Sequence, residues 1–91
     1  MQFEWDPYKA IRNFDNHGVS FEEASTIFDD PVYITVLDDE HSDDEQRYIS
    51  IGMSRSNRVI LVAHTERQGY VRIISARKAM RNERGYYEEG L

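Results

Sequence analysis

The chain has 91 residues, 40% of them hydrophobic and 31% charged, and a formal net charge of −6 at pH 7. This length suits one domain with a modest core and is too short for two domains. Because the chain has no cysteine, disulfides and thiolate metal sites are excluded. No signal peptide or membrane-spanning apolar run is visible, so we expect a cytoplasmic protein with no membrane partner.

The charges are distributed unevenly along the chain. Residues 1–45 contain thirteen Asp and Glu against two Lys and Arg, a net charge of −11, whereas residues 46–91 contain nine Lys and Arg against four Glu, a net charge of +5. This asymmetry predicts that the second half binds a polyanion and that the acidic first half faces a basic partner. The alternative is that the two halves neutralise each other within the fold.

The first elements are a short strand, Phe3 to Trp5, and a helix. Asp6 is a suitable N-cap and Pro7 a suitable first helical residue, so we expect a helix from Pro7 to His17, ended by a left-handed Gly18. One apolar stripe of this helix is expected to face the core: Tyr8, Ile11 and Phe14.

The next segment, from Ser20 to Phe28, begins with a capping box and predicts a second helix. The residues that this helix is expected to bury are Phe21, Ala24, Ile27 and Phe28. A β-branched run, Val32 to Leu37, predicts a strand, and the acidic segment Asp38 to Glu45 predicts an exposed loop.

Three further strands are predicted, over Gln46 to Ser54, Val59 to Ala63 and Tyr70 to Ala76. The last strand is expected to lead directly into a basic helix that carries Arg77, Lys78, Arg81 and Arg84. The predicted fold is therefore a single α+β domain of order β-α-α-β-β-β-β-α. Its antiparallel sheet has four to five strands, with two N-terminal helices and a C-terminal basic helix.

The turns suggest how the strands pair. A three-residue loop over residues 67–69 places Arg72 opposite His64, and a three-residue loop over residues 55–57 places Tyr48 opposite His64. One face then carries the row Tyr48, His64 and Arg72. The other face carries an apolar layer for the N-terminal helices to cover: Ile49, Ile51, Met53, Val59, Leu61, Ala63, Val71 and Ile73. A two-residue loop at 55–57 would instead place Arg47 opposite His64, and the sequence allows both arrangements.

This row has the side chains that metal-independent RNA hydrolysis needs. His64 can act as base or acid near neutral pH, Arg72 can stabilise charge on a phosphate, and Tyr48 can stack on a base. The residues expected to follow the RNA backbone are Arg77, Lys78, Arg81 and Arg84. In the alternative interpretation His64 is a hydrogen-bonded surface residue, Tyr48 and Arg72 pack across strands, and the basic helix is solvated. No metal or cofactor site is predicted.

Four segments together resemble the BrnT family of toxins: FEWDPYKAIRNFDNHGVSFEEASTIFDDP, EQRYISIG, HTERQGYVRIISARKAMRNER and YEEG. The resemblance implies a bacterial type II toxin with a RelE-like fold, a ribosome-independent endoribonuclease that arrests translation. It also implies a BrnA-like antitoxin that masks the toxin and represses their shared operon, so that DNA is bound only through the complex. The functional positions implied by the resemblance are Lys9, Arg47, His64, Arg72 and Arg77.

The chain departs from this family in being more acidic, with Asn16 where a basic residue is usual before HGVSF. Two hypotheses follow from the sequence. In the first, the protein is a metal-independent endoribonuclease with His64 and Arg72 at its centre, supported by Arg47, Tyr48 and Lys9. In the second, it is a catalytically inactive RelE-like module that acts in complex formation and operon repression.

Overall fold

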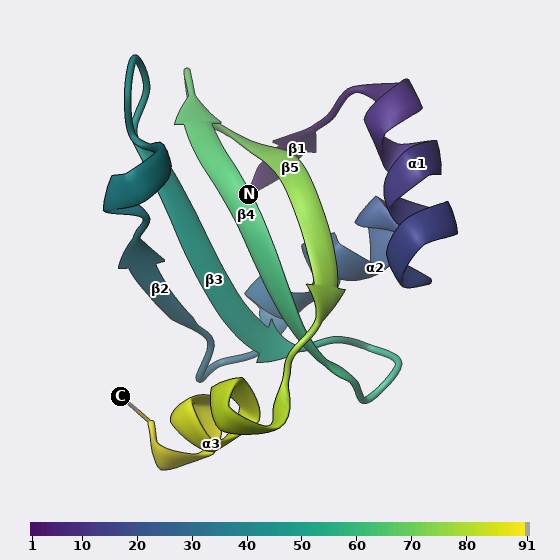
Figure 1. Ribbon diagram of the computed structural model, residues 1–91, viewed down its shortest axis with the longest axis vertical. Coiled ribbons are helices and arrows are strands. Elements are labelled where there is room, and N and C mark those ends of the chain that lie inside the picture. Colours follow the sequence, from purple (N-terminus) through teal and green to yellow (C-terminus); the bar gives the residue numbers. More distant parts are fainter. Residues whose placement is uncertain (91) are drawn as a thin grey trace.

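The computed structural model describes residues 1–90 of the chain. A five-stranded sheet has the order β1-β5-β4-β3-β2, as Figure 1 shows. Its strands are β1 (Gln2–Glu4), β2 (Ile34–Leu37), β3 (Arg47–Met53), β4 (Val59–Arg67) and β5 (Tyr70–Lys78). The helices are α1 (Pro7–His17), α2 (Phe21–Ser25) and α3 (Arg81–Glu89), with short 3-10 helices η1 (Thr26–Asp29) and η2 (Asp39–His41).

The predicted α+β class and order of elements are confirmed, with one correction to the sheet. Three strand pairs are antiparallel, but β1 pairs with β5 in parallel, which makes the sheet mixed. A parallel pair needs a long connection, and the chain between β1 and β5 includes all the other strands. No helix in residues 1–90 combines the length and the apolar character needed to span a bilayer.

The caps confirm the predicted boundaries of α1 and the predicted start of α2, but α2 ends at Ser25 and the rest of the predicted helix forms η1 instead. The Oδ1 atom of Asp6 accepts hydrogen bonds from the backbone N–H groups of Tyr8 and Lys9, at 2.8 and 3.3 Å, and Gly18 ends α1 with a φ of +69°. The Ser20 hydroxyl accepts from the Glu23 N–H at 3.0 Å and begins α2. These caps depend only on neighbouring residues, which explains why the sequence pattern predicts them well.

Helices α1 and α2 cover one face of the sheet, which we call the covered face (Figure 1). The core between them is built from buried apolar side chains that both layers contribute: Val19, Phe21, Ala24, Ile27, Ile60, Val62, Val71, Ile73 and Ala76. The predicted burial of Phe21, Ala24 and Ile27 in the second helix is thus confirmed, and Phe28 packs against this core partly buried.

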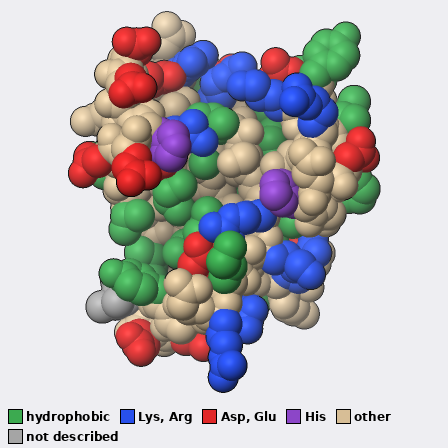
Figure 2. All heavy atoms as spheres, in the orientation of Figure 1, with side chains coloured by type: hydrophobic (Ala, Val, Ile, Leu, Met, Phe, Trp, Pro, Cys, Tyr) green, Lys and Arg blue, Asp and Glu red, His purple; other side chains and the backbone are tan. Residues whose placement is uncertain are grey.

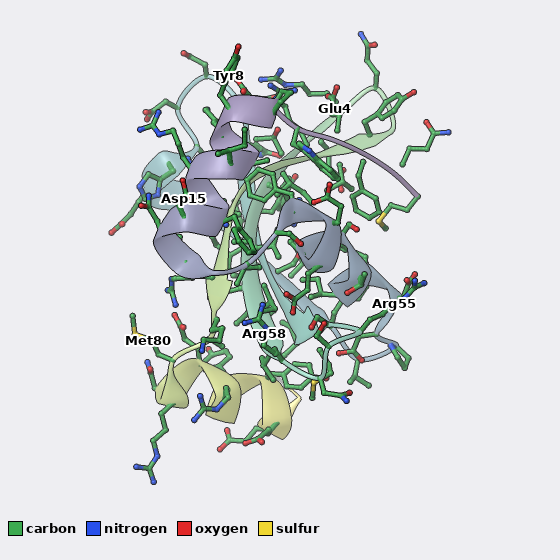
Figure 3. The ribbon with its side chains drawn as sticks, turned by 90° about the vertical axis from the view of Figure 1, so that its right-hand side faces the viewer. Glu4, Tyr8, Asp15, Arg55, Arg58 and Met80 are labelled. Carbon is green, nitrogen blue, oxygen red and sulfur yellow. The ribbon has the colours of Figure 1, made fainter. Side chains whose placement is uncertain are left out.

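The stripe Tyr8, Ile11 and Phe14 does not face this core, contrary to the prediction. These side chains are 78%, 60% and 55% exposed, and in Figure 3, where α1 lies before the sheet, Tyr8 lies at the upper end of the helix. The helix contacts the sheet through a neighbouring stripe instead, with Asn13 buried and Ala10 packed against the core. The prediction was wrong because α1 packs through Ala10 and the amide of Asn13, and a search for apolar periodicity detects neither a small residue nor a polar one as core-facing.

The other face of the sheet, which we call the open face, carries most of the apolar layer that was expected under the helices. Strand pairing places there the side chains of Ile49, Ile51, Met53, Val59, Leu61 and Ala63. Val71 and Ile73 lie on the covered face. The predicted layer was therefore assigned to the wrong face for six of its eight residues.

Two features of the β4–β5 hairpin account for this difference. Its loop has two residues, Gln68 and Gly69, both with positive φ, so Tyr70 pairs with Arg67 rather than with Glu66. A bulge then interrupts the pairing between Ala63 and His64, leaving Ile74 as an extra residue of β5. From Tyr70 to Ile73 the strand pairs regularly, with Arg72 opposite Thr65. From Ser75 onward, odd-numbered residues of β5 lie on the open face and even-numbered residues on the covered face, the reverse of the earlier part of the strand.

Asn13 joins α1 to the sheet and to the chain that follows the helix. It is 7% exposed; its Nδ2 donates to the carbonyls of Val19 (2.9 Å) and Ala76 (2.8 Å), and its Oδ1 accepts from the Ala76 N–H at 3.0 Å. Asn13→Ala leaves these backbone groups without partners, and each unpaired buried group costs about 1–3 kcal/mol.

We therefore expect Asn13→Ala to lower the free energy of unfolding by about 3 kcal/mol, as measured by urea denaturation. The control is Asn16→Ala on the exposed side of the same helix, which should change stability by less than about 0.5 kcal/mol. Equal effects of the two substitutions would show that the Asn13 hydrogen bonds do not fasten the helix.

Candidate functional site

A row of polar side chains crosses the open face at one end of the sheet. Arg47 of β3 pairs with Thr65 of β4, and Thr65 pairs with Arg72 of β5, so these three side chains project from the same face. Arg72 pairs in turn with Glu4 of β1. Because neighbouring strands lie about 4.8 Å apart, the backbones of the two arginines are separated by about 10 Å. Their long side chains can therefore reach one phosphate from two sides.

The two arginines of this row are weakly paired. The Arg47 Nε atom lies 3.9 Å from Asp38 Oδ2, and the Arg72 NH1 atom lies 3.8 Å from Glu4 Oε2, both longer than a hydrogen bond. By contrast, Arg67 binds Glu45 through two hydrogen bonds of 2.8 and 2.9 Å, and these hydrogen bonds lower the pKa of Glu45. The guanidinium groups of Arg47 and Arg72 thus retain donors for a ligand.

Unpartnered buried polar atoms occur at this same end of the sheet. Within residues 1–90, the buried side-chain atoms without a hydrogen-bond partner are Arg47 Nε, Thr65 Oγ1 and His64 Nδ1. Two of them belong to the row on the open face. Such groups are uncommon in folded proteins because they are costly, and they require an explanation. This end of the open face therefore has polar atoms whose hydrogen-bonding capacity is unused within residues 1–90.

His64 lies on the covered face, behind this row, and is 2% exposed. Its Nε2 atom is 2.8 Å from the Ser50 hydroxyl oxygen, and its ring stacks on Tyr48 with centroids 5.7 Å apart. Burial lowers the pKa of His64 from 6.5 to about 4, so the ring is neutral at pH 7. The pairing of Tyr48 with His64 is confirmed, whereas the predicted pairing of Arg72 with His64 is wrong, because His64 pairs with Ile73.

Lys9, the remaining predicted catalytic residue, lies on α1 at the edge of β5. It lines a shallow basic pocket of about 260 Å³ with Arg12, Asn13, Asn16, His17, Ile74 and Ser75. Ser75 pairs with Ala63 on the open face, so this pocket extends the open face beyond β5. No acidic residue lines it. The pocket therefore adds a basic region beside the row, and this arrangement was not predicted from the sequence.

The four predicted RNA-binding residues are divided between two elements. Arg77 and Lys78 belong to β5, where they pair with Leu61 and Ile60, and only Arg81 and Arg84 lie in α3. The expected helix carrying all four residues is thus wrong, because strand pairing overrides the local sequence preference. Arg77 lies on the open face and makes two hydrogen bonds to Glu83, at 2.8 and 2.9 Å, which lower the pKa of that carboxyl.

Ion pairs between the acidic and basic halves answer the question raised by the charge asymmetry. Five of the seven ion pairs within residues 1–90 join an acid of residues 1–45 to an arginine of residues 46–91. One of these pairs, partly buried, joins Arg58 to Glu23, and the hydrogen bonds from the guanidinium lower the pKa of Glu23. Internal neutralisation is therefore part of the explanation. Within the same residues Lys9, Arg12, Lys78, Arg81 and Arg84 make no ion pair.

Figure 2 views the molecule in the orientation of Figure 1 and shows Lys and Arg side chains in an upper group and in a lower group near α3. Hydrophobic side chains lie between these groups, and acidic side chains gather at the upper left. Residues 1–90 contain no cluster of three His, Asp or Glu side chains that could hold a metal ion. Further Lys and Arg side chains lie across the middle of this view, so the basic groups are spread over much of this face.

Sequence reasoning missed Thr65 and Glu4 as members of the row. Thr65 was obscured by the assumed register, which placed His64 beside Arg72, and Glu4 was missed because no pairing partner was predicted for the first strand. A Gln-Gly pair does not indicate a two-residue hairpin as Asn-Gly or Asp-Gly would, so the sequence offered little to correct the register. The bulge at Ile74 likewise has no glycine to mark it.

The fold is an α+β sheet with helices on one face and an open face that carries arginines, and comparison with known proteins defines the class of protein. The chain is structurally similar to the crystal structure of the Brucella abortus ribonuclease toxin BrnT, with a TM-score of 0.65 and 20% sequence identity. The match covers 89% of this chain and 99% of that chain. Among proteins with curated descriptions, none matches this sequence.

Residues 5–83 match the family described as "Ribonuclease toxin, BrnT, of type II toxin-antitoxin system". This match begins at Trp5, just after β1, includes all five catalytic candidates and ends at Glu83 in the first turn of α3. The chain therefore belongs to the BrnT family of ribonuclease toxins, which confirms the resemblance seen in the sequence.

Proposed function

We propose that this protein is a metal-independent, ribosome-independent endoribonuclease whose RNA lies across the open face of the sheet. The observation that carries the proposal is the row of Arg47, Thr65 and Arg72, in which two weakly paired guanidinium groups flank an unpartnered hydroxyl. Guanidinium groups bind phosphate oxygens through paired hydrogen bonds and stabilise the charge that develops during cleavage. Cutting of cellular RNA in this way would inhibit translation.

The chemical step follows from the groups on this row. The 2′-hydroxyl oxygen of the RNA attacks the neighbouring phosphorus, and Glu4, 3.8 Å from Arg72, accepts its proton. The bond to the 5′-oxygen breaks, and that oxygen takes a proton from water. Arg47 and Arg72 hold the phosphate while negative charge builds on it. The products are a 2′,3′-cyclic phosphate and a 5′-hydroxyl end.

The RNA contacts lie on the open face. His64 lies on the covered face behind these contacts, and its hydrogen bond with Ser50 joins β4 to β3. The catalytic roles expected for His64 and Tyr48 stay predictions. Lys9 and Arg12 extend the binding surface beyond β5, and Arg81 and Arg84 of α3 provide salt-sensitive backbone contacts at the other end. Lys78 pairs with the core residue Ile60 on the covered face, so its predicted contact with RNA is not part of this proposal. A protein antitoxin, BrnA-like in character, would neutralise the toxin, and DNA would be bound only through that complex.

The direct test is to incubate the purified protein with single-stranded RNA in EDTA without ribosomes. We expect cleavage products with cyclic phosphate ends, detected by gel electrophoresis and mass spectrometry. DNA of the same sequence lacks the attacking 2′-hydroxyl, so it should remain intact.

Cleavage of the DNA control would contradict the proposed chemistry. RNA that remains intact both with and without added Mg²⁺ would favour the alternative function, an inactive module of the toxin–antitoxin complex. RNA cut only when Mg²⁺ is present would contradict metal independence alone.

A further inference from the structure

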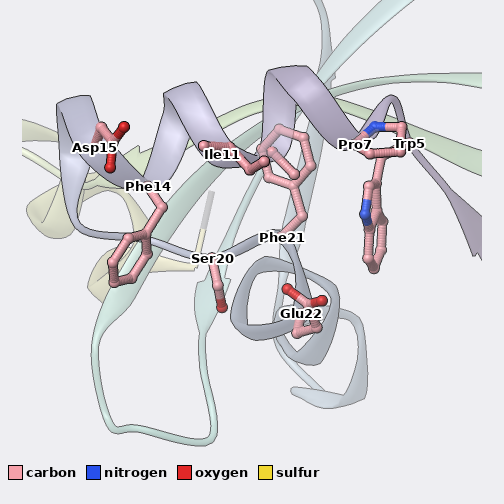
Figure 4. A pocket seen from close by; sticks show the side chains of 9 residues that line it. Trp5, Pro7, Ile11, Phe14, Asp15, Ser20, Phe21 and Glu22 are labelled. Carbon is pink, nitrogen blue, oxygen red and sulfur yellow. The ribbon is translucent and has the colours of Figure 1, made fainter.

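An apolar groove of about 490 Å³ lies between α1 and α2, on the helix side of the molecule (Figure 4). Trp5 lies at one end and Phe14 at the other, with Ile11 and Phe21 between them. The RNA chemistry proposed above uses none of these residues. The groove thus requires an explanation of its own.

The walls of the groove are apolar and partly exposed. Ile11 and Phe14 are 60% and 55% exposed, although they follow a helical spacing that would suit burial. The floor is rigid, because Trp5 packs edge-on against the fully buried Phe21 with ring centroids 5.9 Å apart. Clustered apolar side chains exposed beside a rigid floor are typical of a protein interaction site.

The rim of the groove is acidic. Asp15 of α1 and Glu22 of α2 line it, and within residues 1–90 neither makes an ion pair. No basic residue lines the groove. Like charges therefore disfavour RNA, an anionic membrane surface and a second copy of this groove as occupants. A partner with basic groups around an apolar stripe is complementary in charge.

We propose that this groove binds an amphipathic helix of the antitoxin, with apolar side chains toward Ile11 and Phe14 and with Lys or Arg beside Asp15 and Glu22. The inference rests on the proposed function in that the partner is the antitoxin. From Pro7 to Phe14, α1 rises by about 10 Å, which matches two turns of a docked helix. Two turns present apolar anchors at i, i+3 or i+4 and i+7, the spacing by which helices occupy such grooves.

RNA and the antitoxin would therefore bind to two different surfaces of the toxin. The open face contacts RNA, whereas the groove holds the antitoxin from the helix side. Antitoxin binding and RNA cleavage should consequently respond to different substitutions.

The test is isothermal titration calorimetry of the full-length toxin with the antitoxin of the same toxin–antitoxin pair. Ile11→Asp and Phe14→Asp place a charge at the centre of the interface, and we expect each to weaken binding about 30-fold or more. Asp15→Lys combined with Glu22→Lys should weaken binding about tenfold and reduce its salt dependence.

The matched control is Val32→Asp, which alters a side chain that is also 60% exposed but lies outside the groove. It should leave the affinity unchanged. Because Ile11 and Phe14 are exposed, their variants should keep the wild-type melting temperature and the wild-type rate of RNA cleavage. Hydrogen exchange should show protection of α1 and α2 in the complex.

Wild-type affinity in the folded Ile11→Asp and Phe14→Asp variants would overturn the groove proposal. Concentration-dependent self-association of the wild type that these variants abolish would also overturn it, because a second copy of the toxin would then occupy the groove. A wild-type toxin that does not bind the antitoxin would overturn the groove proposal and the proposed neutralisation, but not the proposed RNA cleavage. Groove-dependent binding by a toxin that cuts no RNA would refute the nuclease alone.

Discussion

Arg72→Gln is expected to lower the rate of RNA cleavage by about 10²–10³-fold while the protein remains folded. The reason is that a donor aimed at charge developing in a transition state is worth this much when removed alone. Arg72 is weakly engaged within the protein, with its NH1 atom 3.8 Å from Glu4, so little stability depends on it. Arg47→Gln should have a similar effect, because Arg47 lies on the other side of Thr65.

The measurement is single-turnover cleavage of a labelled RNA, with the melting temperature recorded for each variant. Arg55→Gln is the control, because its side chain is 78% exposed and its loop lies outside the row. Arg72→Lys should restore only part of the rate, since an ammonium cannot bind two phosphate oxygens as a guanidinium does. A folded Arg72→Gln variant that cuts RNA within threefold of wild type would contradict the assignment.

Thr65→Val distinguishes a functional from a structural role within the same row. Valine has nearly the shape of threonine, and the Thr65 hydroxyl is buried without a partner, so this substitution should not destabilise the fold. If the hydroxyl contacts the phosphate, RNA affinity or the cleavage rate should still fall.

His64 is expected to make the free energy of unfolding fall as the pH is lowered. Burial lowers the pKa of His64 to about 4, whereas the unfolded chain titrates near 6.5. The folded state therefore prefers the neutral ring, and its stability is fully present above pH 6.5. As the pH falls from 6.5 to 4 the unfolded state takes up the proton first, and this group's contribution of about 3 kcal/mol is lost progressively.

This pH dependence is measured by urea denaturation of the wild type and of His64→Gln at intervals from pH 7 to pH 4. Gln cannot titrate here but can still form a hydrogen bond with Ser50, so the variant should show a shallower loss of stability. Carboxylates contribute equally to both proteins, and the difference between the two curves isolates His64. Parallel curves would show that His64 is not held neutral in the folded protein.

The positions of His64 and Arg72 show where sequence reasoning about the site succeeded and where it failed. Arg47 and Arg72 were identified as candidates, and the structure brings both to one row. The partner of Arg72, however, is Thr65 rather than His64, because the hairpin loop is one residue shorter than assumed. A shift of one residue in a strand moves every side chain to the opposite face, so a small error in the loop exchanged the two faces.

The bulge at Ile74 had a second consequence for the open face. Arg72 and Arg77 are five residues apart, and in a regular strand they would point to opposite faces. The extra residue brings both to the open face while Ile73 and Ala76 both remain in the core. The packing of the core selects this arrangement, and no single residue of β5 indicates it.

Features that depend on near neighbours could be predicted from the amino-acid sequence alone. The caps of α1 and α2, the order of the elements and the α+β class follow from residues within a few positions of one another, such as Asp6 with Pro7 and Ser20 with Glu23. The family also follows from the sequence, since its motifs extend over most of the chain.

Which side of each element meets which partner, in contrast, depends on how the helices and strands pack together. The burial of His64, the exposure of Ile11 and Phe14, and the row of Arg47, Thr65 and Arg72 all depend on pairing between residues distant in the chain. Such pairing is settled by the core as a whole, because alternative registers differ little in local preference but greatly in the apolar surface they bury.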